Sequence, residues 1–260
     1  MTTADLISFD FVYRIVLQVQ NFALMAFKVF TNLFSKPRYI SDTYLQMDAI
    51  GVSSIPIVLL TGFFTGAVLA LQSSLSLKAF GAVNLTGQLV ALTLVRELGP
   101  VLVALMVAGR IGSGISSQLG SMVVTEQIDA MRALGTDPIR KLVTPRVVAT
   151  TTMLPLLTVL GDLFGMIGGW IVSLNALKLN TSLYWSEALR SMTYIDALEG
   201  LVKPFVFGLI IGMVGCYTGL NTKGGTSGVG KSTTTSVVMA SILVIVADFF
   251  ISKLILGFRS

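Results

Sequence analysis

The chain has 260 residues, of which 53% are hydrophobic and 12% are charged, with a net charge of +5 and a mean hydropathy of +0.83. Soluble domains carry about 25% charged residues, so this composition excludes an ordinary soluble protein and predicts an integral membrane protein. The positive residues flank apolar stretches, as they do beside transmembrane helices, so we expect no nucleic-acid partner.

The residue types also limit the chemistry of the chain. The sequence contains no His, and its single cysteine, Cys216, lies within an apolar run. One chain therefore cannot form a disulfide or a Cys/His zinc site, and acid–base catalysis by histidine is excluded, so we expect no metal site. No polar linker divides the sequence, which predicts a single domain over residues 1–260.

Residues 6–38 have the pattern of an amphipathic helix. Polar residues recur at helical spacing and form one stripe: Asp10, Arg14, Gln18, Asn21, Lys28 and Asn32. Apolar side chains fill much of the remaining circumference, which is typical of a helix lying in the membrane interface. A spanning helix is the alternative. The stretch Lys36-Pro37-Arg38 then ends the helix and adds positive charge, which favours a cytoplasmic N-terminus.

Five further segments are candidates for transmembrane helices, because a hydrocarbon core of about 30 Å requires roughly 20 apolar residues in a helix. They are residues 50–71, 85–120, 145–174, 203–220 and 230–256. With the N-terminus inside, the cytoplasmic segments hold most flanking cations, namely Lys36, Arg38, Arg132, Arg140, Lys141, Arg146, Lys223 and Lys231, whereas Lys78, Lys178 and Arg190 face outward. The predicted fold is an all-α integral membrane protein with an interfacial helix, five spans and a short cytoplasmic helix.

Small residues recur every four positions within these segments. The rows are Gly62, Gly66 and Ala70; Ala104, Ala108, Gly112, Ser116 and Gly120; Gly161, Gly165 and Gly169; and Gly208 and Gly212. Such rows let helix backbones approach closely in lipid. They predict tight packing within one chain, or dimerisation through one of the rows.

Arg96 and Glu97 lie in the middle of the second predicted span, directly before Gly99 and Pro100. Intramembrane charges are costly unless they are paired or wetted, so they indicate a functional site that meets a lipid headgroup or lines a wet cavity. A purely structural salt bridge is the alternative. The Gly-Pro pair predicts a break in the regular helix beside the charges.

Asp162 and Asp248 are further carboxylates within predicted spans. We interpret both as buried hydrogen-bonding partners between helices in preference to a proton relay.

Residues 125–140 are polar and predict a short amphipathic helix on the cytoplasmic surface. Gly135 fits the C-terminal stop of this helix, and Asp137-Pro138 fits the N-cap and first position of the next turn. In a transporter driven by a separate ATPase, such a helix can fit a groove of the partner. An ordinary loop helix is the alternative.

The segment Gly225–Ser232 matches G-x-x-x-x-G-K-[ST], the phosphate-binding loop of P-loop ATPases, and Asp248 follows an apolar run like a Walker B strand. A true P-loop follows a buried strand in an α/β sheet, whereas this segment lies between two predicted spans, too close to Asp248 for the required crossover. We therefore interpret the glycines as a tight cytoplasmic turn with Lys231 as an anchor. A membrane ATPase using this segment is a competing hypothesis.

Four motifs together resemble the MlaE (YrbE) permease family of MCE-linked lipid transporters. They are Leu94-Val95-Arg96-Glu97-Leu98-Gly99-Pro100, Ala108-Gly109-Arg110-Ile111-Gly112-Ser113, Glu126-Gln127-Ile128-Asp129-Ala130-Met131 and Leu134-Gly135-Thr136-Asp137-Pro138. The resemblance implies the permease subunit of an ABC transporter that moves phospholipids or related lipids between the inner membrane and the outer envelope. Such a subunit has no catalytic residue and binds no cofactor, since ATP and Mg²⁺ belong to a partner ATPase.

The resemblance also implies partners and site residues. A homodimer in the inner membrane would bind two copies of a cytoplasmic ABC ATPase and a periplasmic MCE-domain protein, with a small STAS-domain protein as a further candidate. The implied lipid pathway comprises Arg96, Glu97, Leu69, Leu77 and Phe80, and the implied ATPase-coupling residues are Glu126, Gln127, Asp129, Met131 and Arg132. The alternative function is an ion-coupled secondary transporter that uses Glu97, Asp162 or Asp248.

Overall fold

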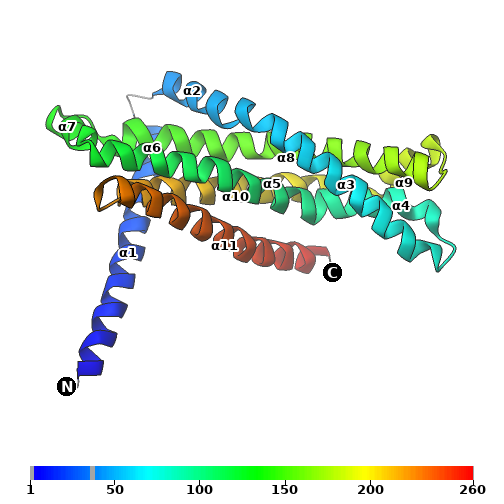
Figure 1. The fold of residues 1–260 in the computed structure, drawn as a ribbon, viewed down its shortest axis with the longest axis horizontal. Coiled ribbons are helices and arrows are strands. Elements are labelled where there is room, and N and C mark those ends of the chain that lie inside the picture. The colour runs from blue at the N-terminus through cyan, green and yellow to red at the C-terminus, as the bar shows by residue number, and fades with distance from the viewer. Residues whose placement is uncertain (1–2, 36–38, 260) are drawn as a thin grey trace.

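The computed structural model describes the backbone of residues 3–35 and 39–259, and the side chains of residues 13, 16–35 and 39–257. Figure 1 shows a long bundle of helices, with α1 (Thr3–Phe34) projecting from it across the direction of the others. Every regular element in the described part of the chain is a helix. Five segments there are long and apolar enough to cross a membrane, which confirms the predicted all-α membrane fold.

Several of these segments are built from more than one helix. The first comprises α2 (Ile40–Ile50), the 3₁₀ turn η1 (Val52–Ser54) and α3 (Ile55–Lys78). The second comprises the 3₁₀ turn η2 (Val83–Leu85), α4 (Thr86–Thr93), the π-helix η3 (Leu94–Leu98), α5 (Gly99–Val107), the π-helix η4 (Ala108–Gly112) and α6 (Ser113–Val124). The third joins the π-helix η5 (Ile139–Val143) to α8 (Thr144–Ala176), and the last two are α10 (Tyr194–Leu220) and α11 (Gly225–Arg259).

Two short helices lie outside the spans. The first, α7 (Gln127–Ala133), follows α6, and the second, α9 (Thr181–Ser191), joins α8 to α10. Figure 1 places α7, the start of α2 and the α10–α11 turn at one end of the bundle, and α9 with the α3–α4 connection at the other. We call the first end the α7 end.

Small residues allow α3, α8 and α10 to pack closely. A Cβ atom built on Gly66 would overlap the carbonyl oxygen of Gly165, so the α3 and α8 backbones touch at this point. A Cβ on Gly208 would come within 2.6 Å of the Thr150 carbonyl oxygen, which brings α10 against α8 in the same way. In lipid, close backbone approach supplies the van der Waals contact that holds helices together. These rows therefore serve packing within one chain.

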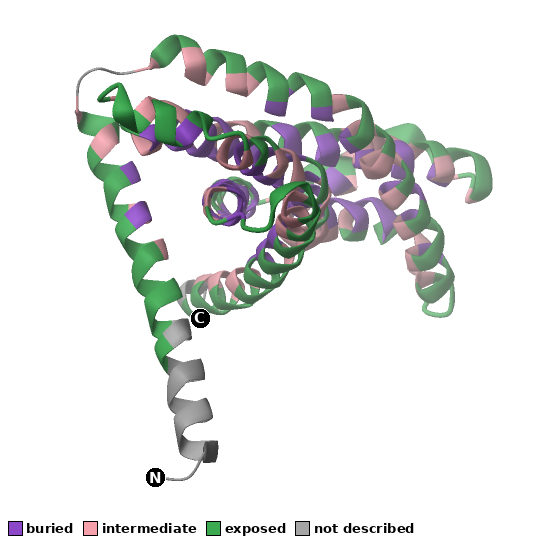
Figure 2. Cartoon of the chain, turned by 60° about the vertical axis from the view of Figure 1, so that its left-hand side comes forward, coloured by how far each residue is buried: buried purple, intermediate pink, exposed green. Residues whose placement is uncertain are grey.

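The N-terminal helix α1 contacts η5, α8 and α10 through its C-terminal half. Met25 and Val29 are buried there, and the Tyr217 hydroxyl donates a hydrogen bond of 3.1 Å to the carbonyl oxygen of Gln18. Most other described side chains of α1 are exposed (Figure 2). The predicted break at Lys36-Pro37-Arg38 lies outside the described residues.

The fourth span begins at Tyr194, well before the predicted start at residue 203. The added turns carry Asp196 and Glu199, whose charges sequence hydropathy excludes from a span, and they lead to Lys203 at the predicted start. All three are buried among partners of opposite charge, and paired charges are tolerated within a bundle. Hydropathy alone therefore underestimates the length of this helix.

The segment resembling a P-loop forms the first turns of α11. The chain ends α10 at Leu220, turns through Gly224 and Gly225, which have φ values of +92° and +67°, and continues as one helix to Arg259. Positive φ is easily adopted by glycine, which explains their place in this turn. A helix and not a strand precedes the segment, which argues against a P-loop. The segment itself is helical, so the predicted tight turn lies just before it, at residues 221–225.

Candidate functional site

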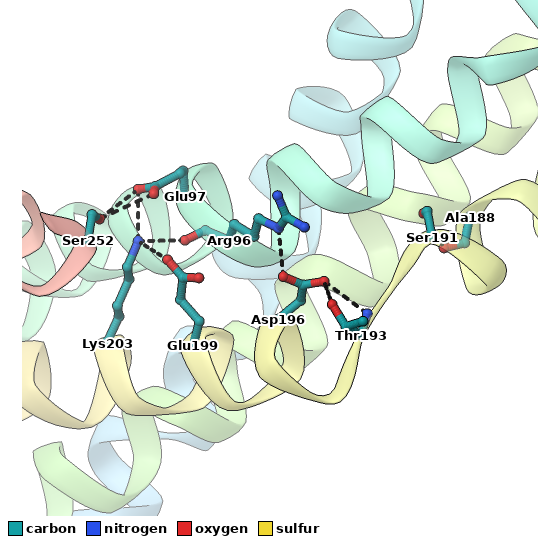
Figure 3. Close-up of polar contacts among 9 residues, drawn as sticks. All are labelled: Arg96, Glu97, Ala188, Ser191, Thr193, Asp196, Glu199, Lys203 and Ser252. Carbon is teal, nitrogen blue, oxygen red and sulfur yellow. Dashed lines mark hydrogen bonds and ion pairs between the residues drawn. The ribbon is translucent and has the colours of Figure 1, made fainter. Parts of the chain in front are cut away.

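The π-helix η3 carries Arg96 and Glu97 and lies against α10. It ends directly before Gly99 and Pro100, where the sequence predicts a break in the regular helix. Proline lacks the amide hydrogen that a regular turn requires, and π-turns are frequent at functional sites. The two adjacent charged side chains leave this turn toward different partners (Figure 3).

Arg96 pairs with Asp196 at the start of α10. The Arg96 Nε donates to Asp196 Oδ1 at 2.7 Å, and the Asp196 side chain is fully buried. The other carboxylate oxygen accepts a hydrogen bond of 2.9 Å from the backbone N–H of Thr193, which forms part of a capping box. Both carboxylate oxygens are therefore bonded, and the pair fixes η3 against the first turn of α10.

Lys203 is the centre of a second group of charges. Its ammonium group lies 2.8 Å from Glu97 Oε2, 3.0 Å from Glu199 Oε1 and 3.4 Å from Asp248 Oδ1. It also donates to the carbonyl oxygen of Arg96 at 2.7 Å. The Lys203 side chain is 0% exposed, so its charge is compensated by protein groups and not by water.

Ser252 on α11 completes this arrangement. Its hydroxyl donates to Glu97 at 3.2 Å, so Glu97 bridges a residue of α10 and a residue of α11 (Figure 3). We call the set Arg96, Glu97, Asp196, Glu199, Lys203, Asp248 and Ser252 the charge network. It connects three of the five spans, and its carboxylates outnumber its cations.

A cavity of about 490 Å³ opens beside the charge network. Its lining comprises Arg96, Glu97, Glu199, Phe249, Ser252, Lys253, Ile255 and Leu256. The Glu97 side chain is 47% exposed, and Lys253 forms no ion pair with another residue that the structure describes. The cavity thus offers charged groups beside apolar side chains, an environment suited to an amphiphile with a charged headgroup.

The described residues hold no cluster of three or more His, Cys, Asp or Glu side chains that could bind a metal ion. The Lys203 ammonium group lies at the centre of the carboxylates, where a metal cation would otherwise bind. The chemistry that this arrangement supplies is therefore ion pairing and hydrogen bonding.

The structure does not bring the predicted apolar wall to this cavity. Leu69 is half-buried and packs against a small cluster of Ala70, Val90 and Leu94. Leu77 is half-buried near the end of α3, and Phe80, in the turn after α3, is 84% exposed. Leu69 packs where α3, α4 and η3 meet, and none of the three residues is among those that line the cavity between η3, α10 and α11. Their role in a lipid pathway stays a prediction.

The helix α7 presents most of the predicted coupling residues to solvent at the α7 end. Glu126 adopts a left-handed conformation with φ 58° and precedes the helix, so α6 and α7 are separated by a sharp break. Gln127, Asp129 and Arg132 are exposed and Met131 is half-buried. The buried Ile128 anchors the helix to the bundle.

The turn after α7 follows the predicted pattern. Gly135 has φ +75°, and Asp137 Oδ1 accepts a hydrogen bond of 2.9 Å from the backbone N–H of Ile139. Leu134 lies beside this turn and is 83% exposed. An exposed leucine next to a polar helix is a feature of contact surfaces that the sequence pattern did not single out.

Asp162 and Asp248 differ in their surroundings. Asp248 lies near Lys203 and belongs to the charge network. Asp162 is buried, its Oδ1 has no hydrogen-bond partner among the residues that the structure describes, and a Cβ on Gly99 would overlap that oxygen. The expected hydrogen bond between helices is therefore not made by Asp162 Oδ1.

Sequence reasoning missed four members of the charge network, Asp196, Glu199, Lys203 and Ser252. A signal was present, because residues 196, 199 and 203 are spaced by three and four and so share one helix face. Glu199 and Lys203 form an i,i+4 pair of opposite charge. Their position before the most apolar part of α10 concealed them from a hydropathy criterion.

Five apolar spans that enclose a charge network beside a half-apolar cavity define a multi-pass membrane protein with a polar site between its helices. Comparison with known proteins gives the family. The model of the family "Permease MlaE" matches residues 43–254. This chain belongs to the MlaE permease family.

Individual relatives cover most of the chain. A probable ABC transporter permease protein of Rickettsia typhi is 43% identical over 234 residues, or 90% of each chain. The intermembrane phospholipid transport system permease protein MlaE of Haemophilus influenzae is 35% identical over 235 residues, 89% of this chain and 90% of the relative. Protein TRIGALACTOSYLDIACYLGLYCEROL 1, chloroplastic, of Arabidopsis thaliana is 37% identical over 212 residues, 82% of this chain and 61% of that protein.

Proposed function

We propose that this chain is the membrane-spanning subunit of an ABC transporter that moves phospholipids or related lipids between the inner membrane and the outer envelope. The observation that carries the proposal is the cavity beside Glu97, which combines charged and apolar lining within the spans of an MlaE-family permease. Named relatives include an ABC transporter permease and a phospholipid transport permease.

The cavity has the groups that a phospholipid headgroup requires. Arg96 and Lys253 are donors for a phosphate, and Lys253 has no ion-pair partner among the described residues. Glu97 and Ser252 can contact amine or hydroxyl groups. Phe249, Ile255 and Leu256 provide the apolar surface for acyl chains. The buried Lys203 then holds Glu97 in place from the opposite side, which makes it a positioning residue.

The energy source is ATP hydrolysis in a separate ABC ATPase, of which two copies bind a homodimer of this chain. We assign the ATPase contact to α7, through Glu126, Gln127, Asp129, Met131 and Arg132. Support comes from the exposure of most of these side chains at one end of the bundle and from the anchoring of the helix by Ile128. Helix-in-groove contacts of this kind place an exposed amphipathic helix in a partner's surface.

The same proposal gives the orientation of the chain in the membrane and its other partners. The α7 end faces the cytoplasm, and α1 lies in the membrane interface with its N-terminus on the cytoplasmic side, as its direction across the bundle favours. The other end meets a periplasmic MCE-domain protein, with a STAS-domain protein as a further partner. In the most apolar stretch of α11 only 11% of the residues are buried within the chain, whereas 56% are buried in that of α10. The exposed face of α11 is therefore open to lipid or to a second copy of the chain.

Leu69, Leu77 and Phe80 are proposed as the apolar wall at the outer end of the lipid pathway. The 84% exposure of Phe80 favours its contact with lipid or with a second protein chain. In this arrangement the charge network and the apolar wall contact successive parts of the transported lipid.

An ion-coupled secondary transporter is the alternative function. The buried Asp162, whose Oδ1 lacks a hydrogen-bond partner, is the observation that favours it, because intramembrane carboxylates of this kind occur in proton relays. Lipid transport that continues without ATP and stops when the proton gradient collapses would support this alternative.

The test is lipid-stimulated ATP hydrolysis by the co-expressed permease–ATPase complex in liposomes, comparing wild type with Glu97→Ala and Lys231→Ala. We expect Glu97→Ala to abolish the lipid stimulation while basal hydrolysis persists, because the cavity loses its central carboxylate. We expect Lys231→Ala, in the exposed first turns of α11, to retain the stimulation. The opposite result would assign the working site to the glycine segment and overturn the proposal.

A further inference from the structure

A second cavity, of about 310 Å³, lies at the α7 end between α1, α2, η5 and α8. We call it the α1–α2 cavity. Its lining residues come from all four elements and comprise Asn32, Leu33, Tyr39, Ile40, Thr43, Tyr44, Met47, Arg140, Thr144, Pro145 and Val148. None of these residues lines the cavity beside Glu97, so the two spaces are separate.

Two residues that line the α1–α2 cavity each have a buried donor without an acceptor. The Nδ2 of Asn32 and the Nε of Arg140 are both buried, and neither makes a hydrogen bond with another residue that the structure describes. Buried polar atoms are nearly always hydrogen-bonded, and leaving one unpaired costs about 1–3 kcal/mol. A guanidinium has donors only, so the missing partner must supply acceptor oxygens.

The charges around the cavity favour an anionic partner. Lys141 is paired with Asp42 at 2.7 Å, and its ammonium group lies 4.4 Å from the Tyr39 ring centroid. Arg140 forms no ion pair with any residue that the structure describes. The nearby Arg146 is buried and donates to the Leu142 carbonyl oxygen at 2.9 Å, again without a carboxylate partner. Positive charge at this corner therefore exceeds negative charge.

The position along the span places the cavity at headgroup depth. The first span, Ile40–Lys78, has 39 residues, whereas the hydrocarbon core needs roughly 20, so its two ends extend into the interfaces. The cavity lies at the Ile40 end, where Tyr39 and Tyr44 line it, and tyrosine is enriched at membrane interfaces. Leu33, Met47 and Val148 supply apolar contact beside the two donors.

We propose that the α1–α2 cavity binds one anionic phospholipid from the leaflet that surrounds the α7 end. The phosphodiester oxygens accept from the Arg140 guanidinium and the Asn32 side-chain amide, and the first methylene groups of the acyl chains contact Met47 and Val148. Because the ligand contacts four elements, it stabilises the position of α1 against α2 and α8. This site requires only that the chain span a membrane, and it is independent of which lipid is transported.

The test is native mass spectrometry of the full-length protein, purified in detergent with the subunits that remain bound and titrated with dioleoylphosphatidylglycerol. We expect a bound lipid whose apparent Kd rises about tenfold in Arg140→Gln, because one charge-assisted hydrogen bond is lost. Thr43→Phe fills the cavity while both donors remain, and we expect the same loss. Lys223→Gln removes an exposed cation in the α10–α11 turn at the same end, and it serves as the matched control with unchanged affinity.

Two further titrations identify the ligand. Dioleoylphosphatidylcholine should bind more weakly than dioleoylphosphatidylglycerol, because it carries no net charge. Millimolar inorganic phosphate should not displace the lipid, and displacement would assign the site to a free phosphate and overturn the proposal. Unchanged lipid affinity in both Arg140→Gln and Thr43→Phe would overturn it as well. If Arg140→Gln fails to fold, as thermal unfolding without added lipid would reveal, Thr43→Phe decides the result.

Discussion

Lys203 and Glu97 form an ion pair of 2.8 Å between α10 and η3, and the two side chains differ sharply in exposure. Lys203 is 0% exposed, whereas Glu97 is 47% exposed and faces a cavity. The protein therefore buries the Lys203 ammonium group and exposes the Glu97 carboxylate to the cavity. This difference predicts that Lys203 acts mainly on stability and on the position of Glu97, and that Glu97 acts mainly on what enters the cavity.

We expect Lys203→Met to lower the free energy of unfolding by about 3 kcal/mol, because it leaves three carboxylates without their buried cation. Thermal unfolding of the purified protein in detergent measures the change. Lys253→Met removes an exposed lysine of the same cavity and should change the stability by about 0.5 kcal/mol or less. Equal effects of the two substitutions would show that Lys203 is not the centre of the network.

The pair Arg96–Asp196 is predicted to be energetically coupled. A double-mutant cycle with Arg96→Gln and Asp196→Asn should give a coupling energy of about 1–3 kcal/mol, since Asp196 is fully buried. The exposed pair Arg132–Asp129 is the comparison, and the same two changes there should couple by at most about 0.5 kcal/mol. A coupling energy near zero for Arg96 and Asp196 would contradict the structure at this site.

Gly66→Ala should destabilise the protein by about 1–3 kcal/mol, because the new Cβ would overlap the carbonyl oxygen of Gly165 and push α3 from α8. Gly230→Ala is the control, for which we expect the opposite effect on stability. A Cβ on Gly230 has open space around it within α11, so alanine should stabilise the helix by about 0.5–1 kcal/mol. Unfolding temperatures of the two variants check both signs, and a stabilising Gly66→Ala would refute the close packing.

Leu134→Ser should weaken binding of the ATPase subunit at least severalfold without lowering stability, because Leu134 is 83% exposed beside α7. Pull-down of the co-expressed ATPase at increasing salt or detergent concentration measures the effect. Leu189→Ser makes the same change on α9 at the other end of the bundle, where the side chain is 60% exposed. If Leu189→Ser weakens the ATPase contact and Leu134→Ser does not, α7 is not the coupling element.

Sequence reasoning found the charged residues of η3 but not their partners. Arg96 and Glu97 stand out because charge is rare in an apolar run. Asp196, Glu199 and Lys203 do not, because they precede the apolar run of α10 and look like the polar flank of a shorter span. Only the packing of η3 against α10 shows that these charges lie inside the bundle.

The rows of small residues also show what a sequence pattern leaves open, namely which helix is the packing partner. Their period of four indicates close helix contact, but the pattern does not say whether the partner helix belongs to the same chain. The structure pairs Gly66 with Gly165 and Gly208 with Thr150, so the rows of α3, α8 and α10 serve contacts within the chain. A dimer interface, if it uses α11, relies on a face that these rows do not mark.

The sequence by itself determined that this protein is a helical membrane protein with charges inside a span, because hydropathy and helix length depend on composition along the chain. It also determined the turn at Gly135 and Asp137, which depends on local backbone and capping preferences. Tertiary structure decided which charges meet, where cavities open and which donors stay unpaired. Those features arise from contacts between segments distant in sequence, such as the ion pair of Lys203 with Asp248 or the cavity that Asn32 and Arg140 line together. Local sequence patterns do not show which distant segments meet.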